Sequence, residues 1–261
     1  MADGRGAIVA IGGGELGLGE TESIDRAIVD LRGRAGPRHL FIPTASGEPE
    51  PYIENVARAY GALGCACFAL RLKAEPSAAE IEDAVLGADI VYVGGGDTAT
   101  MLREWRRFGV DRLLDRAWRN GTILSGLSAG SICWFERGLS DSASFGEGAD
   151  DWDYATVEAL GFLPGAHCPH YDERAREGKF RAWLGRTDID FIGIENLAAL
   201  VVEDGRFRTL AAGRREGRTP RSLAVSSRGG TVREAELPRE GTLAELAALS
   251  GLSGEGKAGA R

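Results

Sequence analysis

Short apolar runs alternate with longer amphipathic stretches through the first half of the chain. The runs predict buried strands, and the stretches, whose apolar residues recur every three or four positions, predict helices. The expected strands are residues 7–11, 39–43, 65–70, 89–93 and 122–125. The expected helices are residues 21–31, 52–63, 78–86, 98–107 and 110–119. This alternation indicates an α/β fold, with a mostly parallel sheet and helices on both of its faces.

The pattern changes in the second half of the chain. Short apolar segments separated by turn signals predict antiparallel additions to the sheet, at residues 189–194, 198–202, 207–211 and 222–225. No internal repeat or linker divides the sequence, so we expect a single domain over residues 1–250. The remaining residues, 251–261, are rich in glycine and charge, and we expect a disordered tail there.

Composition and charge exclude several classes of function. The net charge is −8 and no Lys/Arg-rich run occurs, which argues against nonspecific nucleic-acid binding. The N-terminal residues do not predict a secretory signal, and no apolar stretch approaches about 20 residues, so we expect no membrane association. The four cysteines form no CxxC pair, and free core thiols indicate a reduced, cytoplasmic protein.

A candidate nucleophile lies where the fifth expected strand meets a helix. Residues 126–130 read GLSAG and match the G-x-S-x-G nucleophile elbow, with Ser128 at its centre. A sharp turn of this kind needs small residues on both sides of the serine and raises its hydroxyl above the strand end. The alternative is a tight strand-to-helix turn that merely contains a serine.

A serine nucleophile needs a base, and the chain has three histidines. His39 begins an expected core strand, where a structural role is the simpler interpretation. His167 and His170 lie downstream of the elbow, and either could serve. The sequence His167-Cys168-x-His170 also resembles a metal site, but Pro169 interrupts it and a second ligand cluster is not evident in the sequence. We therefore expect no metal.

A glycine run closes the fourth expected strand. Residues 94–98 read GGGDT, which could be a helix N-cap or a source of backbone N–H groups for an oxyanion. No Lys-Ser/Thr follows, so the run is not a P-loop, and a dinucleotide fingerprint is also absent there. The glycines at residues 12–14 give a similarly weak nucleotide signal.

Three segments in this order, VGGGDTATML, GLSAGSICWF and CPHYDE, resemble the peptidase E (aspartyl dipeptidase) family, which has cyanophycinase relatives. The resemblance runs from the first strand to about Val202. It implies a flavodoxin-like or class I glutamine-amidotransferase-like fold, with Ser128 as nucleophile and His170 as base. It also implies an oxyanion hole formed by the amides of Gly96 and Ala129. The amidotransferases themselves carry cysteine at the elbow.

The resemblance is looser for the remaining site residues. The family's third triad member is an acid after the serine, for which Asp141 is our choice, with Glu136 and Glu147 as alternatives. Arg176 best matches the carboxylate-binding arginine of the family, although the helix around it could equally be a solvated surface. Asp97, where the dipeptidase branch commonly has asparagine, is the other expected substrate-binding residue.

The predicted activity is hydrolysis of small peptides, with an N-terminal aspartyl preference, through an acyl-enzyme and without metal or organic cofactor. The alternatives are a cyanophycinase-like or isoaspartyl peptidase, an esterase of the α/β-hydrolase type, and a noncatalytic ligand-binding relative. The histidine of α/β-hydrolases usually lies near the C-terminus, whereas 91 residues follow His170 here. The expected partner is a small peptide, and a homodimer is left open.

Overall fold

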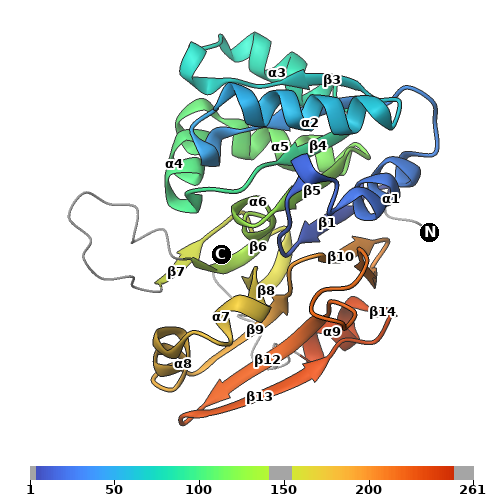
Figure 1. The fold of residues 1–261 in the computed structure, drawn as a ribbon. Helices are drawn as coiled ribbons and strands as arrows, with labels where there is room; N and C mark the ends of the chain where they lie inside the picture. The colour runs from blue at the N-terminus through green and yellow to red at the C-terminus, as the bar shows by residue number, and fades with distance from the viewer. Residues whose placement is uncertain (1–3, 141–154, 250–261) are drawn as a thin grey trace.

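The computed structural model describes residues 4–140 and 155–249, which form two sheets (Figure 1). The first sheet has eight strands in the order β14-β11-β10-β1-β5-β4-β2-β3. Its parallel part is built from β1, β5, β4, β2 and β3, and the expected α/β class is confirmed. The bounds of these five strands are Ile8–Ile11 (β1), Arg38–Ile42 (β2), Ala66–Ala69 (β3), Ile90–Val93 (β4) and Ile123–Leu127 (β5).

Helices cover both faces of the parallel part (Figure 1). In β1, Ile8 and Ala10 join one apolar cluster while Val9 and Ile11 join the other, so the strand is buried on both sides. The first cluster includes α3, α4, α5 and α6, and the second includes α1 and α2. The bounds of these helices are Glu22–Arg32 (α1), Glu50–Ala62 (α2), Ala78–Leu86 (α3), Thr98–Phe108 (α4), Val110–Arg119 (α5) and Ala129–Ile132 (α6).

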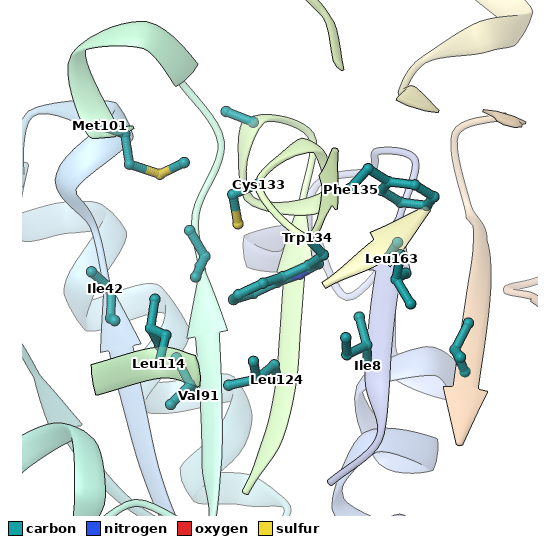
Figure 2. Close-up of a cluster of buried hydrophobic side chains, with 14 of the residues drawn as sticks. Ile8, Ile42, Val91, Met101, Leu114, Leu124, Cys133, Trp134, Phe135 and Leu163 are labelled. Carbon is teal, nitrogen blue, oxygen red and sulfur yellow. The ribbon is translucent and has the colours of Figure 1, made fainter. Parts of the chain in front are cut away.

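Trp134 fills the core beside the predicted elbow. Figure 2 shows its indole lying between Cys133, Leu124 and Ile8, among side chains from several strands. The ring is fully buried, as is Phe135 next to it. Burial of two such aromatic side chains fixes the chain immediately after α6 against the sheet.

The second sheet was not expected from the sequence. Its order is β13-β12-β9-β8-β6-β7, and it occupies the yellow-green to orange part of Figure 1. Two of the four strands predicted as additions to the first sheet, β9 and β12, belong to this second sheet instead, whereas β10 and β11 extend the first as predicted. The strand bounds are Phe135–Ser140 (β6), Ala155–Glu158 (β7), Leu163–Cys168 (β8), Ile189–Ile194 (β9), Ala198–Glu203 (β10), Arg206–Ala211 (β11), Ser222–Arg228 (β12), Thr231–Glu236 (β13) and Glu240–Thr242 (β14).

The stretches after Ser128 and after His170 differ from simple helices. The helix expected after the elbow ends at Ile132, and the chain continues as β6, because Phe135 and Leu139 pack inward on a sheet. The amphipathic stretch after His170 forms two short helices, α7 (Tyr171–Arg174) and α8 (Gly178–Leu184), and α9 (Leu243–Leu249) ends the described chain. Within that part of the chain, none of the helices is long and apolar enough to cross a membrane. The predicted tail at residues 251–261 lies outside the described residues.

Candidate active site

Ser128 lies in a strained turn between β5 and α6. Its backbone has φ 58° and ψ −116°, a conformation that side-chain-bearing residues rarely adopt and that costs on the order of 1–3 kcal/mol. The flanking glycines explain how this turn fits. A Cβ on Gly126 would lie 2.2 Å from the carbonyl oxygen of Gly130, and one on Gly130 would lie 2.2 Å from that of Val93. The G-x-S-x-G pattern therefore reflects packing on both sides of the serine.

The imidazole of His170 faces the Ser128 hydroxyl. His170 lies just beyond β8 with φ 51°, and its Nε2 is 2.9 Å from Ser128 Oγ. The backbone fixes both residues to the end of β1, because the N–H of His170 donates to Gly12 O and that of Ser128 donates to Ile11 O. Two residues 42 positions apart are thus held in hydrogen-bond contact by one strand end.

Asn196 contacts the other ring nitrogen of His170. Its Oδ1 lies 2.7 Å from His170 Nδ1, and its Nδ2 donates to Asp172 Oδ1 (3.0 Å) and Glu173 Oε1 (3.1 Å). Arg215 forms ion pairs with both carboxylates, at 2.9 Å to Asp172 and 2.6 Å to Glu173. The result is a connected series of polar groups from Ser128 to Arg215.

The loop that carries Asn196 is anchored on both sides. The buried carboxylate of Glu195 accepts from the backbone N–H of Arg221 at 2.8 Å and pairs with its guanidinium at 3.0 Å. Leu197 has φ 62°, and its N–H donates to Gly13 O at 2.9 Å. These contacts hold Asn196 in place at the carboxyl end of β9.

The glycine run at residues 12–14 has a steric role. A Cβ on Gly13 would lie 2.1 Å from Asn196 Oδ1 and 2.4 Å from both Cε1 and Nδ1 of His170. Such distances are shorter than real Cβ contacts allow, so only glycine permits these side chains to approach the end of β1. A nucleotide-binding interpretation is not needed to explain this glycine.

His167 is placed away from the Ser128 hydroxyl. It is completely buried, its Nδ1 is 2.8 Å from Ile192 O, and its Nε2 is 2.8 Å from Ser131 Oγ. Burial lowers the pKa of this imidazole to about 3, so the ring is neutral at physiological pH. Of the two histidines left open by the sequence, the structure brings only His170 to Ser128. Within residues 4–140 and 155–249, no cluster of three or more His, Cys, Asp or Glu side chains could hold a metal ion.

Two sources of backbone N–H groups lie near Ser128. Ala129 is the first residue of α6, and the first amides of a helix have no partner inside it. Of the glycine run after β4, Gly95 lines the cavity next to Ser128, and a Cβ on it would be 3.3 Å from that of the serine. Gly96 is pressed against the backbone of Ala45 with φ 138° and does not line the cavity. The oxyanion role of Gly96 and Ala129 stays a prediction, with Gly95 as a further candidate.

The predicted third triad residue cannot be placed. Asp141 and the alternative Glu147 lie outside the described residues. Glu136 is on β6, and its carboxylate accepts the backbone N–H of Gly165 at 3.0 Å. In the described structure the position against His170 Nδ1 is taken by Asn196, which the sequence reasoning did not consider.

The two predicted substrate-binding residues have other partners. The guanidinium of Arg176 is largely exposed and pairs with Glu216 at 2.8 Å, and neither residue lines the cavity. Asp97 is the N-cap of α4 and accepts the N–H of Thr100 at 3.1 Å, which is the alternative that its sequence context offered. The structure thus does not bring Arg176 or Asp97 to Ser128.

A cavity of about 660 Å³ opens over the Ser128–His170 pair. Its charged lining consists of three carboxylates, Glu15, Glu20 and Glu173, and the guanidinium of Arg215. Further lining groups come from the segment after β1 and from the start of α2, namely Leu16, Gly17, Pro51, Tyr52 and Asn55.

Comparison with known proteins identifies the family. The sequence model of peptidase family S51 matches residues 8–210. The chain belongs to this family. Among its relatives, an uncharacterized peptidase, YgaJ, from Bacillus subtilis is 40% identical over 209 residues, which cover 78% of this chain and 87% of that protein. Peptidase E from Streptomyces coelicolor is 28% identical over 208 residues, covering 74% and 81% of the two chains.

Solved structures show the same fold. A peptidase from an acI-B1 Actinobacterium has a TM-score of 0.67 at 19% identity, covering 91% of this chain and 97% of that one. A putative peptidase E protein from Listeria monocytogenes has a TM-score of 0.61 at 20% identity, covering 80% and 100%. The resemblance drawn from the three motifs is confirmed at the level of family and fold.

Sequence reasoning missed Asn196, Asp172 and Glu173. One signal was present: Glu195 and Asn196 directly follow a buried strand, and polar residues at the carboxyl end of a strand often line a site in α/β folds. Because residues 189–194 were predicted as an antiparallel addition to the first sheet, that position was not connected with Ser128.

Proposed function

We propose that this member of peptidase family S51 is a serine-type peptidase that hydrolyses small peptides through an acyl-enzyme on Ser128. The observation that carries the proposal is the 2.9 Å contact between Ser128 Oγ and His170 Nε2 at the floor of an open cavity. The strained backbone of Ser128 adds support, because strain of this kind is concentrated at functional positions.

The proposed reaction begins with attack of Ser128 Oγ on the scissile carbonyl carbon while His170 Nε2 takes the hydroxyl proton. The N–H of Ala129 and one from the glycine run after β4 stabilise the oxyanion, and removal of one such donor typically costs about 10²–10³ in rate. His170 then gives the proton to the leaving amine. Water, activated by the same nitrogen, hydrolyses the acyl-enzyme and frees Ser128.

The charges around the cavity support a substrate with a free amino terminus. Glu15 and Glu20 line the cavity without an ion pair to any described residue, whereas Arg215 is already paired with two carboxylates. An α-ammonium group would meet a net negative wall there. The cavity volume of about 660 Å³ suits a small molecule or short peptide rather than a folded protein.

The aspartyl preference implied by the family resemblance requires a positive group in the cavity that can pair with the substrate carboxylate. Arg176 pairs with Glu216 away from the cavity, and Arg215 is the lining arginine. An aspartyl side chain would have to compete with Asp172 and Glu173 for Arg215. The acidic preference is tested by comparing Asp-Leu with Asn-Leu.

The test combines covalent labelling with a peptide panel. A fluorophosphonate probe should label the wild type and fail to label Ser128→Ala, while Ser131→Ala, which alters a buried neighbouring serine, should still be labelled. The panel contains Asp-Leu, Asn-Leu, isoaspartyl-Leu, Ala-Leu, β-aspartyl-arginine and their N-acetylated forms, with p-nitrophenyl acetate as ester control.

Cleavage that depends on Ser128 and is lost on N-acetylation supports the proposal. Cleavage of acetylated peptides at equal rates would contradict the amino-terminal part alone. Hydrolysis of esters without any peptide would favour an esterase. Absence of both labelling and turnover in a folded preparation would favour a noncatalytic relative.

A further inference from the structure

We propose that Asn196 positions the base His170 and that the buried carboxylate of Asp172 fixes the orientation of the Asn196 amide. The inference deepens the proposed function and rests on it, since it concerns the same Ser128–His170 pair. In place of a carboxylate in direct contact with the imidazole, the described structure has a neutral amide, with the carboxylate one residue further away.

The hydrogen-bond partners of Asn196 determine which way its amide points. The nitrogen Nδ2 lies within reach of two carboxylate oxygens, on Asp172 and Glu173, and ionised carboxylates only accept hydrogen bonds. With the amide reversed, Oδ1 would face both carboxylates and no proton would lie between them. The oxygen of Asn196 is therefore the atom that faces His170.

This orientation selects one protonation state of the imidazole. Since Oδ1 can only accept, His170 Nδ1 must carry the proton, at a distance of 2.7 Å. In the neutral ring, Nε2 then has a free lone pair directed at Ser128 Oγ, 2.9 Å away. The opposite tautomer would present an N–H to the serine and could not take its proton.

Asp172 is built to hold this position. Its side chain is only 2% exposed, and Oδ1 accepts both the backbone N–H of Asn196 (2.8 Å) and its Nδ2 (3.0 Å). The ion pair between Oδ2 and Arg215 compensates the buried charge. Glu173 is half-exposed and makes one of the two contacts to Nδ2, so it is the weaker anchor.

The experiment is a double-mutant cycle with Asp172→Asn and Asn196→Ala. An amide at position 172 can accept from Asn196 only by turning its own NH₂ group onto Arg215, so it no longer enforces one orientation. A wrong histidine tautomer in a serine-protease triad lowers kcat by about 10⁴-fold. Asp172→Asn allows both tautomers and does not enforce the wrong one, so we expect a smaller loss in kcat/KM, of about 10²-fold. In the Asn196→Ala background the same change should cost less than about threefold, because Asp172 acts through Asn196. The matched control is Asp190→Asn, which alters another nearly buried aspartate paired with an arginine and should leave kcat/KM unchanged.

A second readout does not depend on turnover. The chain has only three histidines, so ¹⁵N NMR of histidine-labelled protein can assign each ring. At a pH where His170 is neutral, the wild type should show a proton on Nδ1, and Asp172→Asn should populate the form with the proton on Nε2. His167 serves as an internal reference, since its partners are independent of Asp172.

The outcomes separate the two proposals. A wild-type His170 with its proton on Nε2 overturns the inference even if Asp172→Asn does not fold. The inference is also overturned if the loss of kcat/KM in the double variant equals the product of the two single-variant losses. An unchanged His170 tautomer in folded Asp172→Asn overturns it as well. An inactive wild type with the predicted tautomer would contradict the proposed function and leave the positioning network standing.

Discussion

Replacement of Gly13 by alanine would place a methyl group against the two side chains that lead to Ser128. The added Cβ would lie 2.1 Å from Asn196 Oδ1 and 2.4 Å from Nδ1 and Cε1 of His170. The nearest atoms are all in side chains that border a cavity, so they can move without the sheet moving. We therefore expect the variant to fold and its active-site geometry to change.

The size of the displacement follows from the contact distances. Ordinary contacts begin at 3.4 Å, so the imidazole must retreat by about 1 Å. Its hydrogen bond to Ser128, 2.9 Å in the wild type, would then be broken or strongly bent. A misplacement of about 1 Å in catalytic groups can cost about 10²-fold, and complete loss of general-base assistance costs about 10²–10⁴-fold. The expected loss in kcat/KM is accordingly about 10²-fold or more.

The assay compares peptide turnover and fluorophosphonate labelling of Gly13→Ala with those of Gly61→Ala. Gly61 is the second-to-last residue of α2 and has nothing within 4 Å of its Cβ position, so its replacement should leave activity intact and raise stability by at most about 1 kcal/mol. Thermal unfolding checks the fold of both variants. If folded Gly13→Ala retained activity within a few-fold of wild type, His170 could not be acting as the base from the position seen here.

Three further predictions concern other groups. His170→Gln should lower kcat/KM by at least about 10²-fold. His167→Gln alters a buried ring away from the Ser128 hydroxyl and should lower the kcat/KM of the folded protein far less. The reverse order in purified, folded protein would contradict the assignment of the base. Arg176→Met should change the ratio of kcat/KM for Asp-Leu to that for Asn-Leu by less than about twofold, because the Arg176 guanidinium pairs with Glu216 outside the cavity. A larger change in this ratio would indicate that Arg176 does contact the substrate. Burial raises the pKa of Asp25 from 3.8 to about 6, so the folded state holds the proton more tightly and stability is lost as pH rises from about 4 to about 6. At 1.36 kcal/mol per pKa unit, the loss in the free energy of unfolding is about 3 kcal/mol. Urea unfolding should therefore show the stability of Asp25→Asn relative to wild type rising by about 3 kcal/mol over this pH range. A constant difference between the two proteins would contradict the prediction.

Several features of this protein were determined by the sequence alone. The five strands and five helices of the first half follow from the apolar pattern, because a strand inside a parallel sheet, such as β1, is apolar on both faces, and a covering helix needs only one apolar stripe. The order of the three motifs identified the family. The G-x-S-x-G pattern located Ser128, since only small neighbours fit beside the turn that raises its hydroxyl. Each of these features can be read from a short stretch of sequence, although the packing that requires it, such as the approach of Val93 to Gly130, involves other parts of the chain.

The partners of Ser128 were decided by the tertiary structure. The sequence left two histidines open, and burial of His167 against Ile192 and Ser131 separates it from His170. Asn196 reaches His170 only because β9 joins the second sheet and the carboxyl end of β9 lies next to the carboxyl end of β1. Gly13 lies at this point and leaves room for the side chains of Asn196 and His170. The apolar periodicity of a sequence predicts which residues form a strand. It does not predict which distant strands lie next to each other, because that depends on how distant apolar faces pack together. A polar side chain acquires its role in this site from neighbours that are distant in the sequence and meet it only when both sheets have formed.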